Sequence, residues 1–222
     1  MVLSFFRSGS VGLDHVVTKA VTMLGDARHS FDLATNALLS GGDVGVVSKD
    51  IRETDQRINQ AERELRSELV VHVSVQGSTD IGEVLGLILL LKKIERIGDQ
   101  AKNILDLAES GVVMGGDPDA EILIGQRQIV SALFQEAAEL LAEHDDLPEE
   151  FLQRGAELGA SLQAEIDSYL QSDRPGHEVV PRAIYARYLK RIVANLLGVV
   201  RSATEPIAQG DDNADDYGDL DD

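Results

Sequence analysis

Apolar residues recur every three or four positions along most of this chain, and the runs they form stop at Gly and Pro. This spacing gathers apolar side chains on one face of a helix, whereas a half-buried strand alternates every second residue. The breaks at Gly41-Gly42, Gly77, Gly111 to Asp119, the acidic stretch after Glu143 and Asp173 to Gly176 therefore separate six predicted helices. They cover about residues 13–39, 46–75, 80–110, 120–143, 149–171 and 181–204.

The Gly-rich stretch from Gly111 to Asp119 separates three long helices from three more, which suggests a duplicated three-helix unit. One internal similarity supports duplication. The segment Ile94–Asp99 aligns with Leu189–Ala194, keeping the apolar positions and the Arg but replacing both acids with Lys190 and Ala194. We therefore expect an all-α fold of two tandem three-helix bundles. Residues 1–112 form the first repeat, 117–208 a second, degenerate repeat, and 209–222 an acidic disordered tail.

The composition agrees with a helical bundle, because the apolar residues are mainly Leu, Ile, Val and Ala, with 4% aromatics and no Trp. With no Cys, the chain has no disulfide framework or thiolate metal site, which suits a reducing compartment. No apolar run reaches the roughly 18 to 20 residues that span a bilayer. We expect a cytoplasmic protein. Two alternatives remain for Val2 to Phe6: the segment packs on the bundle, or it contacts the inner face of the membrane.

The net charge of -19 argues against nucleic acid as a partner, because phosphate binding needs clustered Lys and Arg. Part of this charge is in residues 209–222, which hold seven Asp and no Lys or Arg. Such a run is typical of a solvated, disordered end, and a metal or partner site is the alternative.

Two rows of carboxylates are the candidate chemistry. At about 100° per residue, Glu95 and Asp99 lie on one face of the third predicted helix, with Asp106 in line and beside the core residues Ile94 and Ile97. On the second helix, Asp55 and Glu62 share a face with Asn59 between them. Hard cations such as Mg²⁺, Mn²⁺ or Fe take several oxygen ligands, so the two rows can form a metal site if the helices pack together.

The alternative interpretation is that these acids are solvated helix faces, since 27% of the residues are charged. Like charges four residues apart cost roughly 0.2 to 0.5 kcal/mol unless they are neutralised, so a cation or a basic neighbour is expected. Four basic residues of the same helix are candidates for that neighbour, namely Lys92, Lys93, Arg96 and Lys102.

The local sequence around Glu95 and Asp99 is more specific than the spacing of these two residues. Residues 93–104 read Lys-Ile-Glu-Arg-Ile-Gly-Asp-Gln-Ala-Lys-Asn-Ile, which closely resembles the signature of the PhoU family on the third helix of its three-helix unit. Residues 55–62 and 80–84 resemble the family's second-helix pattern and the start of its third helix. The resemblance covers residues 11–110 well, and the second half mainly through its layout.

The resemblance implies tandem three-helix bundles that bind metal clusters and regulate bacterial phosphate uptake and signalling, as negative regulators working with a membrane phosphate transporter and its sensor histidine kinase. Carried over to this chain, the metal ligands are Glu95 and Asp99, with Asp55, Glu62 and Asp80 in support, for an ion such as Fe, Mn, Mg or Zn. Two departures matter. Asn59 stands where an acid often completes the second-helix pattern, and Lys190 and Ala194 argue against a second cluster.

Enzymatic motifs are missing from the sequence. None of the five His forms a Glu-x-x-His or His-x-x-x-His pair, and no Gly-rich stretch ends in Gly-Lys-Ser/Thr. We expect no enzyme activity. The alternatives are an accessory protein of a simpler phosphate permease and a metal-dependent helical-bundle enzyme. The apolar and Gly positions from Ile192 to Val200 are expected to pack inside the chain, with a homodimer seam as the alternative.

Overall fold

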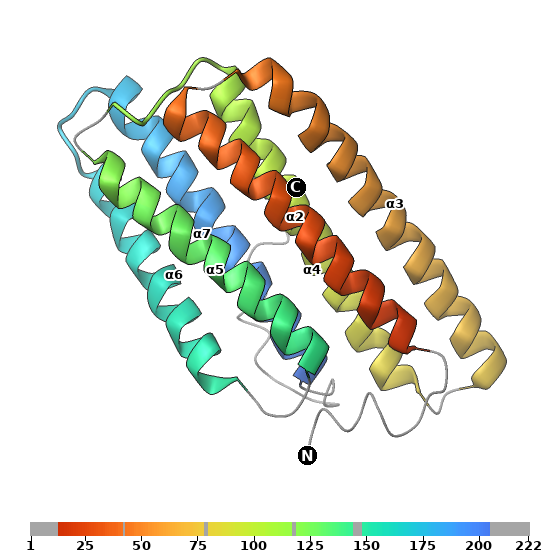
Figure 1. The fold of residues 1–222 in the computed structure, drawn as a ribbon. Helices are drawn as coiled ribbons and strands as arrows, with labels where there is room; N and C mark the ends of the chain where they lie inside the picture. Colours follow the sequence, from red (N-terminus) through yellow and green to blue (C-terminus); the bar gives the residue numbers. More distant parts are fainter. Residues whose placement is uncertain (1–12, 42, 78–79, 117–118, 144–147, 205–222) are drawn as a thin grey trace.

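The computed structural model of the chain describes residues 13–41, 43–77, 80–116, 119–143 and 148–204. Within these residues, the chain forms six long helices that lie side by side along one axis (Figure 1). They are α2 (Asp14–Ser40), α3 (Val44–Gln76), α4 (Ile81–Glu109), α5 (Ala120–Glu143), α6 (Glu149–Leu170) and α7 (Gly176–Thr204). The described part of the chain contains no strand, so the all-α prediction is confirmed.

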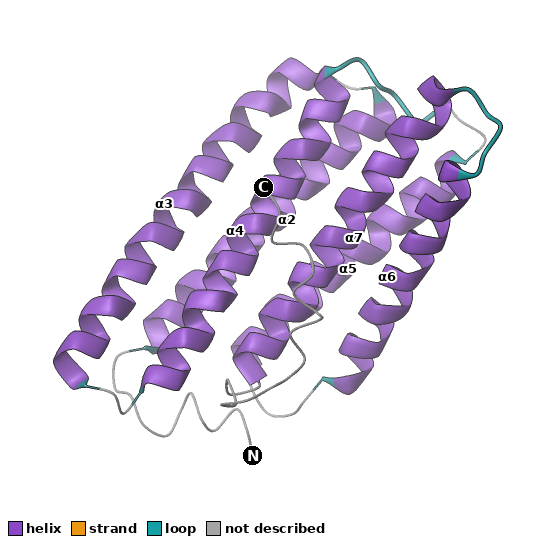
Figure 2. Cartoon of the chain, turned by 180° about the vertical axis from the view of Figure 1, so that it is seen from behind, coloured by secondary structure: helices purple, strands orange, loops and turns teal. Residues whose placement is uncertain are grey.

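The helices form two joined groups of three. Helices α2, α3 and α4 pack together in the first group, and α7 packs against α5 and α6 in the second. Two contacts join the groups, one between α4 and α7 and one between α2 and α5. As a result, α3 and α6 lie at the two outer edges (Figure 2). One continuous apolar core runs through both groups. Phe31 of α2 and Phe134 of α5 belong to it, with ring centroids 5.5 Å apart. The division into two domains stays a prediction.

The ends of the first two helices follow the sequence signals. Gly41 and Gly77 have φ angles of 65° and 81°, left-handed values that favour Gly, and their N–H groups donate to the carbonyls of Ala37 and Val73. The side chain of Asp43 caps α3 by accepting a hydrogen bond from the Gly45 N–H at 3.0 Å. The Gly breaks therefore predicted these ends correctly.

The predicted start of the last helix was wrong. The helix begins at Gly176 and contains Pro181, where the prediction placed its first residue. Pro lacks an N–H and clashes with the carbonyl four residues earlier in a long helix, but within the first two turns this costs little, because few hydrogen bonds precede it. The N–H groups of Glu178 and Val179 already donate to the carbonyl of Pro175, at 2.9 and 3.3 Å.

Two predictions fall outside the described residues. These are the placement of Val2 to Phe6 and the disorder of residues 209–222. By contrast, the interior packing expected for Ile192 to Val200 is confirmed, because Ile192, Leu196 and Val200 are at most 1% exposed within this single chain. Along the described helices, none combines the length and apolarity needed to cross a membrane.

Helix α3 is held by a narrow apolar stripe and by many polar contacts. Its buried residues are only Ile51, Thr54, Ile58, Glu62, Leu65 and Leu69. Three half-exposed carboxyls in its contacts with α2 and α4 have lowered pKa values. Hydrogen bonds from His29 to Asp50, from His15 to Glu68 and from Ser48 to Glu109 are the main causes, since each favours the ionised carboxyl.

These lowered pKa values predict that acid loosens α3. A carboxyl whose pKa is lower in the folded state stabilises the fold above its unfolded pKa, which is about 4 for Asp and Glu. This contribution is lost as the pH falls below that unfolded value and through the lower folded one. Each pair is half-exposed, so we expect only about 0.2 to 1 kcal/mol apiece. The variant Asp50→Asn with Glu68→Gln and Glu109→Gln should melt lower than the wild type at pH 6 and show a smaller acid-induced drop. Equal drops in both proteins would contradict this.

Candidate functional site

The predicted acidic rows meet where α3 and α4 pack antiparallel. Ser48 contacts Glu109, Arg52 contacts Asp106, and Asp55 contacts Lys102. Residue numbers therefore increase along α3 as those of their partners decrease along α4. Close packing at Gly98 permits this approach. A Cβ at Gly98 would lie 3.2 Å from Cδ1 of Ile58, so the missing side chain lets the two helices come together just beside Asp99.

Asp55, Asp99 and Lys102 form a compact group that we call the Lys102 cluster. Lys102 Nζ donates to Asp99 Oδ1 at 3.0 Å and to Asp55 Oδ2 at 3.2 Å. The amide of Asn59 also donates to Asp55 Oδ2, at 3.4 Å. The Asp55 side chain is 14% exposed, Lys102 29% and Asp99 39%. The structure therefore joins one carboxylate of each predicted row through a single ammonium group.

The surroundings of Lys102 hold its positive charge. Burial lowers the pKa of the ammonium, but hydrogen bonding and charge from Asp99, together with the charge of Asp55, outweigh burial and raise the pKa above its usual value. Lys102 is therefore a permanent counter-ion between Asp55 and Asp99 at neutral pH.

Glu95 is neutralised separately. Lys92 Nζ lies 2.7 Å from Glu95 Oε2, and the Glu95 side chain is only 13% exposed. The same buried oxygen has no hydrogen-bond partner among the described residues. The contact is therefore an ion pair by its distance, but it lacks the geometry of a hydrogen bond. Of the four basic neighbours considered from the sequence, Lys92 thus serves Glu95 and Lys102 serves Asp99, while Lys93 points towards α7.

The other two predicted ligands lie apart from the cluster. Glu62 is 5% exposed and pairs with Arg66, whose nitrogen is 3.0 Å away. Asp80 contacts His72 at 3.2 Å, where α4 begins. At 1.5 Å per residue, Asp80 is roughly 28 Å along the helix axis from Asp99. One metal site therefore cannot include both Asp80 and Asp99.

As the side chains lie, these donors do not fit a metal ion. Among the described residues, no three carboxylate or His side chains gather around a common point. Metal ions of this class bind oxygen at about 2.0 to 2.6 Å, and the position between Asp55 and Asp99 is taken by Lys102. An ion at this position would have to displace the ammonium group. Metal binding by these residues stays a prediction.

The second half of the chain carries different chemistry at the aligned positions. Lys190 Nζ donates to the amide oxygen of Gln163 at 2.7 Å, and Ala194 is exposed. Sequence analysis missed a polar group in this half, where Gln126 and Tyr169 both donate to Glu165. Its members come from α5 and α6 with no shared motif, so only the folded arrangement shows that they meet.

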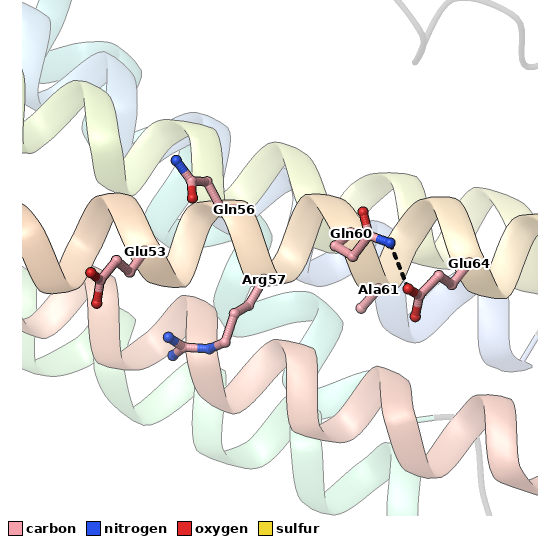
Figure 3. Close-up of a pocket in the computed structure, with 6 residues that line it drawn as sticks. All are labelled: Glu53, Gln56, Arg57, Gln60, Ala61 and Glu64. Atoms are coloured by element: carbon pink, nitrogen blue, oxygen red, sulfur yellow. Dashed lines mark hydrogen bonds between the residues drawn. The ribbon is translucent and has the colours of Figure 1, made fainter.

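A shallow hollow lies on the outer side of α3, away from the Lys102 cluster. Figure 3 shows its lining residues, which are Glu53, Gln56, Arg57, Gln60, Ala61 and Glu64. The Gln60 amide donates to Glu64 across it. Five of its six lining residues are polar or charged, and none of the predicted site residues is among them, so the candidate site is the α3–α4 face rather than this hollow.

The described residues thus define a class of protein, an all-helical pair of three-helix groups with an acidic, internally neutralised face on the first. Residues 20–108 match the family model of the PhoU domain, which spans α2, α3 and α4. Residues 20–108 are therefore a PhoU domain, and the resemblance expected from the sequence is confirmed for this part of the chain.

A solved structure agrees on the fold. The chain is similar to the crystal structure of PhoU from Pseudomonas aeruginosa, with a TM-score of 0.70 and 22% identity, over 86% of this chain and 94% of that one. At this identity the likeness concerns the fold alone, and it extends beyond the domain match into α5, α6 and α7. Comparison with curated proteins finds no match to this sequence.

Proposed function

We propose that this chain regulates phosphate uptake and phosphate signalling as a cytoplasmic helical adaptor. The observation that supports this most is the PhoU domain at residues 20–108, whose signature segment, residues 93–104, lies on α4 with Glu95 and Asp99 partly exposed on one face. The partners that fit this role are a membrane phosphate transporter and a phosphate-sensing histidine kinase. The role is regulatory rather than enzymatic, and its direction is negative.

An adaptor needs a surface that can contact another protein, and α4 supplies one row of exposed side chains. Ile81, Leu85 and Leu89 are 47%, 45% and 39% exposed and stand four residues apart. Further along the same helix the row becomes polar at Lys92, Glu95 and Asp99. Exposed apolar side chains grouped in this way are typical of surfaces that contact partners.

Metal binding is the second part of the proposal. An Fe, Mn, Mg or Zn ion would use Asp55 and Asp99 and would compete with Lys102 for them. This competition predicts that metal content depends on Lys102 as well as on the acids.

Deletion in the source organism tests the proposed role. Loss of a negative regulator should raise phosphate-starvation gene expression when phosphate is plentiful, and the wild-type chain supplied in trans should restore repression. Asp99→Asn with Glu95→Gln should restore it only in part. The matched control is Glu53→Gln on the outer side of α3, where the side chain is 57% exposed.

The outcomes separate the alternatives. Reduced phosphate uptake with normal starvation-gene expression would indicate an accessory protein of a simpler permease. Unchanged uptake together with unchanged expression would contradict both roles.

A further inference from the structure

Helix α7 is basic in a strongly acidic chain. Its 29 residues carry five Arg or Lys, whereas Glu178, in the first turn, is its only acid. The remainder of the helix, from Val179 to Thr204, has no carboxylate side chain. A concentration of positive charge of this kind in a protein of net charge -19 is a candidate surface for an acidic partner.

Three of these basic residues share the outer face of α7. At about 100° per residue, Arg187, Arg191 and Arg201 fall within an arc of roughly 80°. Arg187 and the intervening Ala194 are exposed, and Arg191 and Arg201 are partly exposed. The opposite face of the helix holds the buried residues Leu189 and Val200. The Arg side chains therefore form a row along the outside of the bundle.

A fourth cation reaches this row from α4. A Cβ built at Gly198 would lie 2.6 Å from Lys93 Nζ and 2.8 Å from Lys93 Cδ, so the Lys93 side chain crosses α7 directly over Gly198. Gly198 points in a direction between those of Arg187 and Arg191 on the helix. Arg187, Arg191, Arg201 and Lys93 together make what we call the α7 basic face.

The most acidic segment of the chain begins five residues after α7 ends. Residues 209–222 hold seven Asp and no basic residue. From Thr204 back to Arg187, α7 rises about 26 Å, and the 18 residues after Thr204 can extend to roughly 60 Å. The segment is thus long enough to turn back and follow the whole α7 basic face, with Asp211 to Asp216 reaching its Arg residues.

We propose that the acidic segment 209–222 binds the α7 basic face of its own chain. Charge complementarity supports this occupant, because the seven carboxylates of residues 209–222 are opposite in charge to the four cations of the α7 basic face. Covalent attachment keeps the local concentration of the segment high, so weak surface ion pairs suffice to hold it there. Docking would place the segment beside α4, at the join between the two helix groups.

Cross-linking in the full-length protein tests the proposal. The natural chain has no Cys, so two introduced thiols are the only ones. Ala214→Cys puts a thiol among the Asp residues without removing a charge, and Ala194→Cys puts its partner on the α7 basic face. We expect a bis-maleimide to join this pair readily at low ionic strength, with a lower yield in high salt, because salt screens such contacts.

The matched control places the second thiol at the same height on a different helix. Gly155 packs against Leu197 and Gln163 contacts Lys190, so the exposed Ala160 of α6 lies at the level of Ala194. Ala160→Cys with Ala214→Cys should cross-link several times more slowly. Adding Arg187→Gln and Arg191→Gln to the first pair should reduce its rate towards that of the control. Equal cross-linking rates for the Ala194 and Ala160 pairs would overturn the proposal. So would a fast rate for the Ala194 pair that persists in high salt and also persists after the two Arg→Gln substitutions.

Discussion

Replacing Gly115 with Ala should destabilise the protein by about 2 to 4 kcal/mol, because a new side chain in this linker would overlap the backbone of α2. A Cβ at Gly115 would lie 1.7 Å from the carbonyl oxygen of Leu39 and 2.9 Å from its carbonyl carbon. Backbone atoms at the end of a helix cannot turn aside as a flexible side chain can. The linker is also fixed there by the Met114 N–H, which donates to the Leu38 carbonyl at 3.0 Å.

Thermal unfolding followed by circular dichroism measures this effect. For a chain of this size the loss corresponds to a melting temperature lower by roughly 5 to 15 °C. Gly116→Ala is the matched control, because a Cβ there meets nothing within 4 Å, and it should change stability by no more than about 0.5 kcal/mol. Similar melting of the two variants would show that the linker does not depend on its contact with α2.

Local sequence signals predicted the helices well, because most helix ends here depend on neighbouring residues. Gly41 and Gly77 end helices through their own left-handed backbone, which no distant contact is needed to explain. The start of α7 was missed for the converse reason. Pro181 looks like a first helical residue, but a helix tolerates Pro in its second turn when the preceding residues form a turn of their own, as Glu178 and Val179 do with Pro175.

The candidate site was predictable along each helix but not between helices. Helical spacing placed Glu95 and Asp99 on one row, and Asp55 and Glu62 on another, but the register of α3 against α4 depends on tertiary packing at Ile58 and Gly98. That register brings Asp55 to Lys102 and leaves Glu62 buried beside Arg66. The sequence named Lys102 among four basic neighbours, and only the fold distinguishes it from Lys93, which reaches α7 instead.

Because Lys102 stands between two carboxylates, its removal should make the α3–α4 face respond to metal ions. In Lys102→Met, Asp55 and Asp99 keep their positions but lose the ammonium that neutralises them, so their repulsion favours any cation that can replace it. We expect Mn²⁺ to raise the melting temperature of this variant more than that of the wild type. A ligand at 100 times its dissociation constant stabilises the folded state by about 2.7 kcal/mol.

Two further variants show whether the ion binds at this cluster. Lys92→Met also removes one lysine from α4, but its ion pair within the described part of the chain is with Glu95, so its response to Mn²⁺ should stay close to that of the wild type. Adding Asp99→Asn to Lys102→Met takes away one of the two carboxylates and should abolish the gain, since hard cations need several anionic oxygens. If Lys92→Met and Lys102→Met responded equally, the added affinity would come from net charge, and the cluster would have no special relation to metal binding. A selective response of Lys102→Met would mean that the PhoU domain of this chain keeps a potential metal position closed with its own lysine.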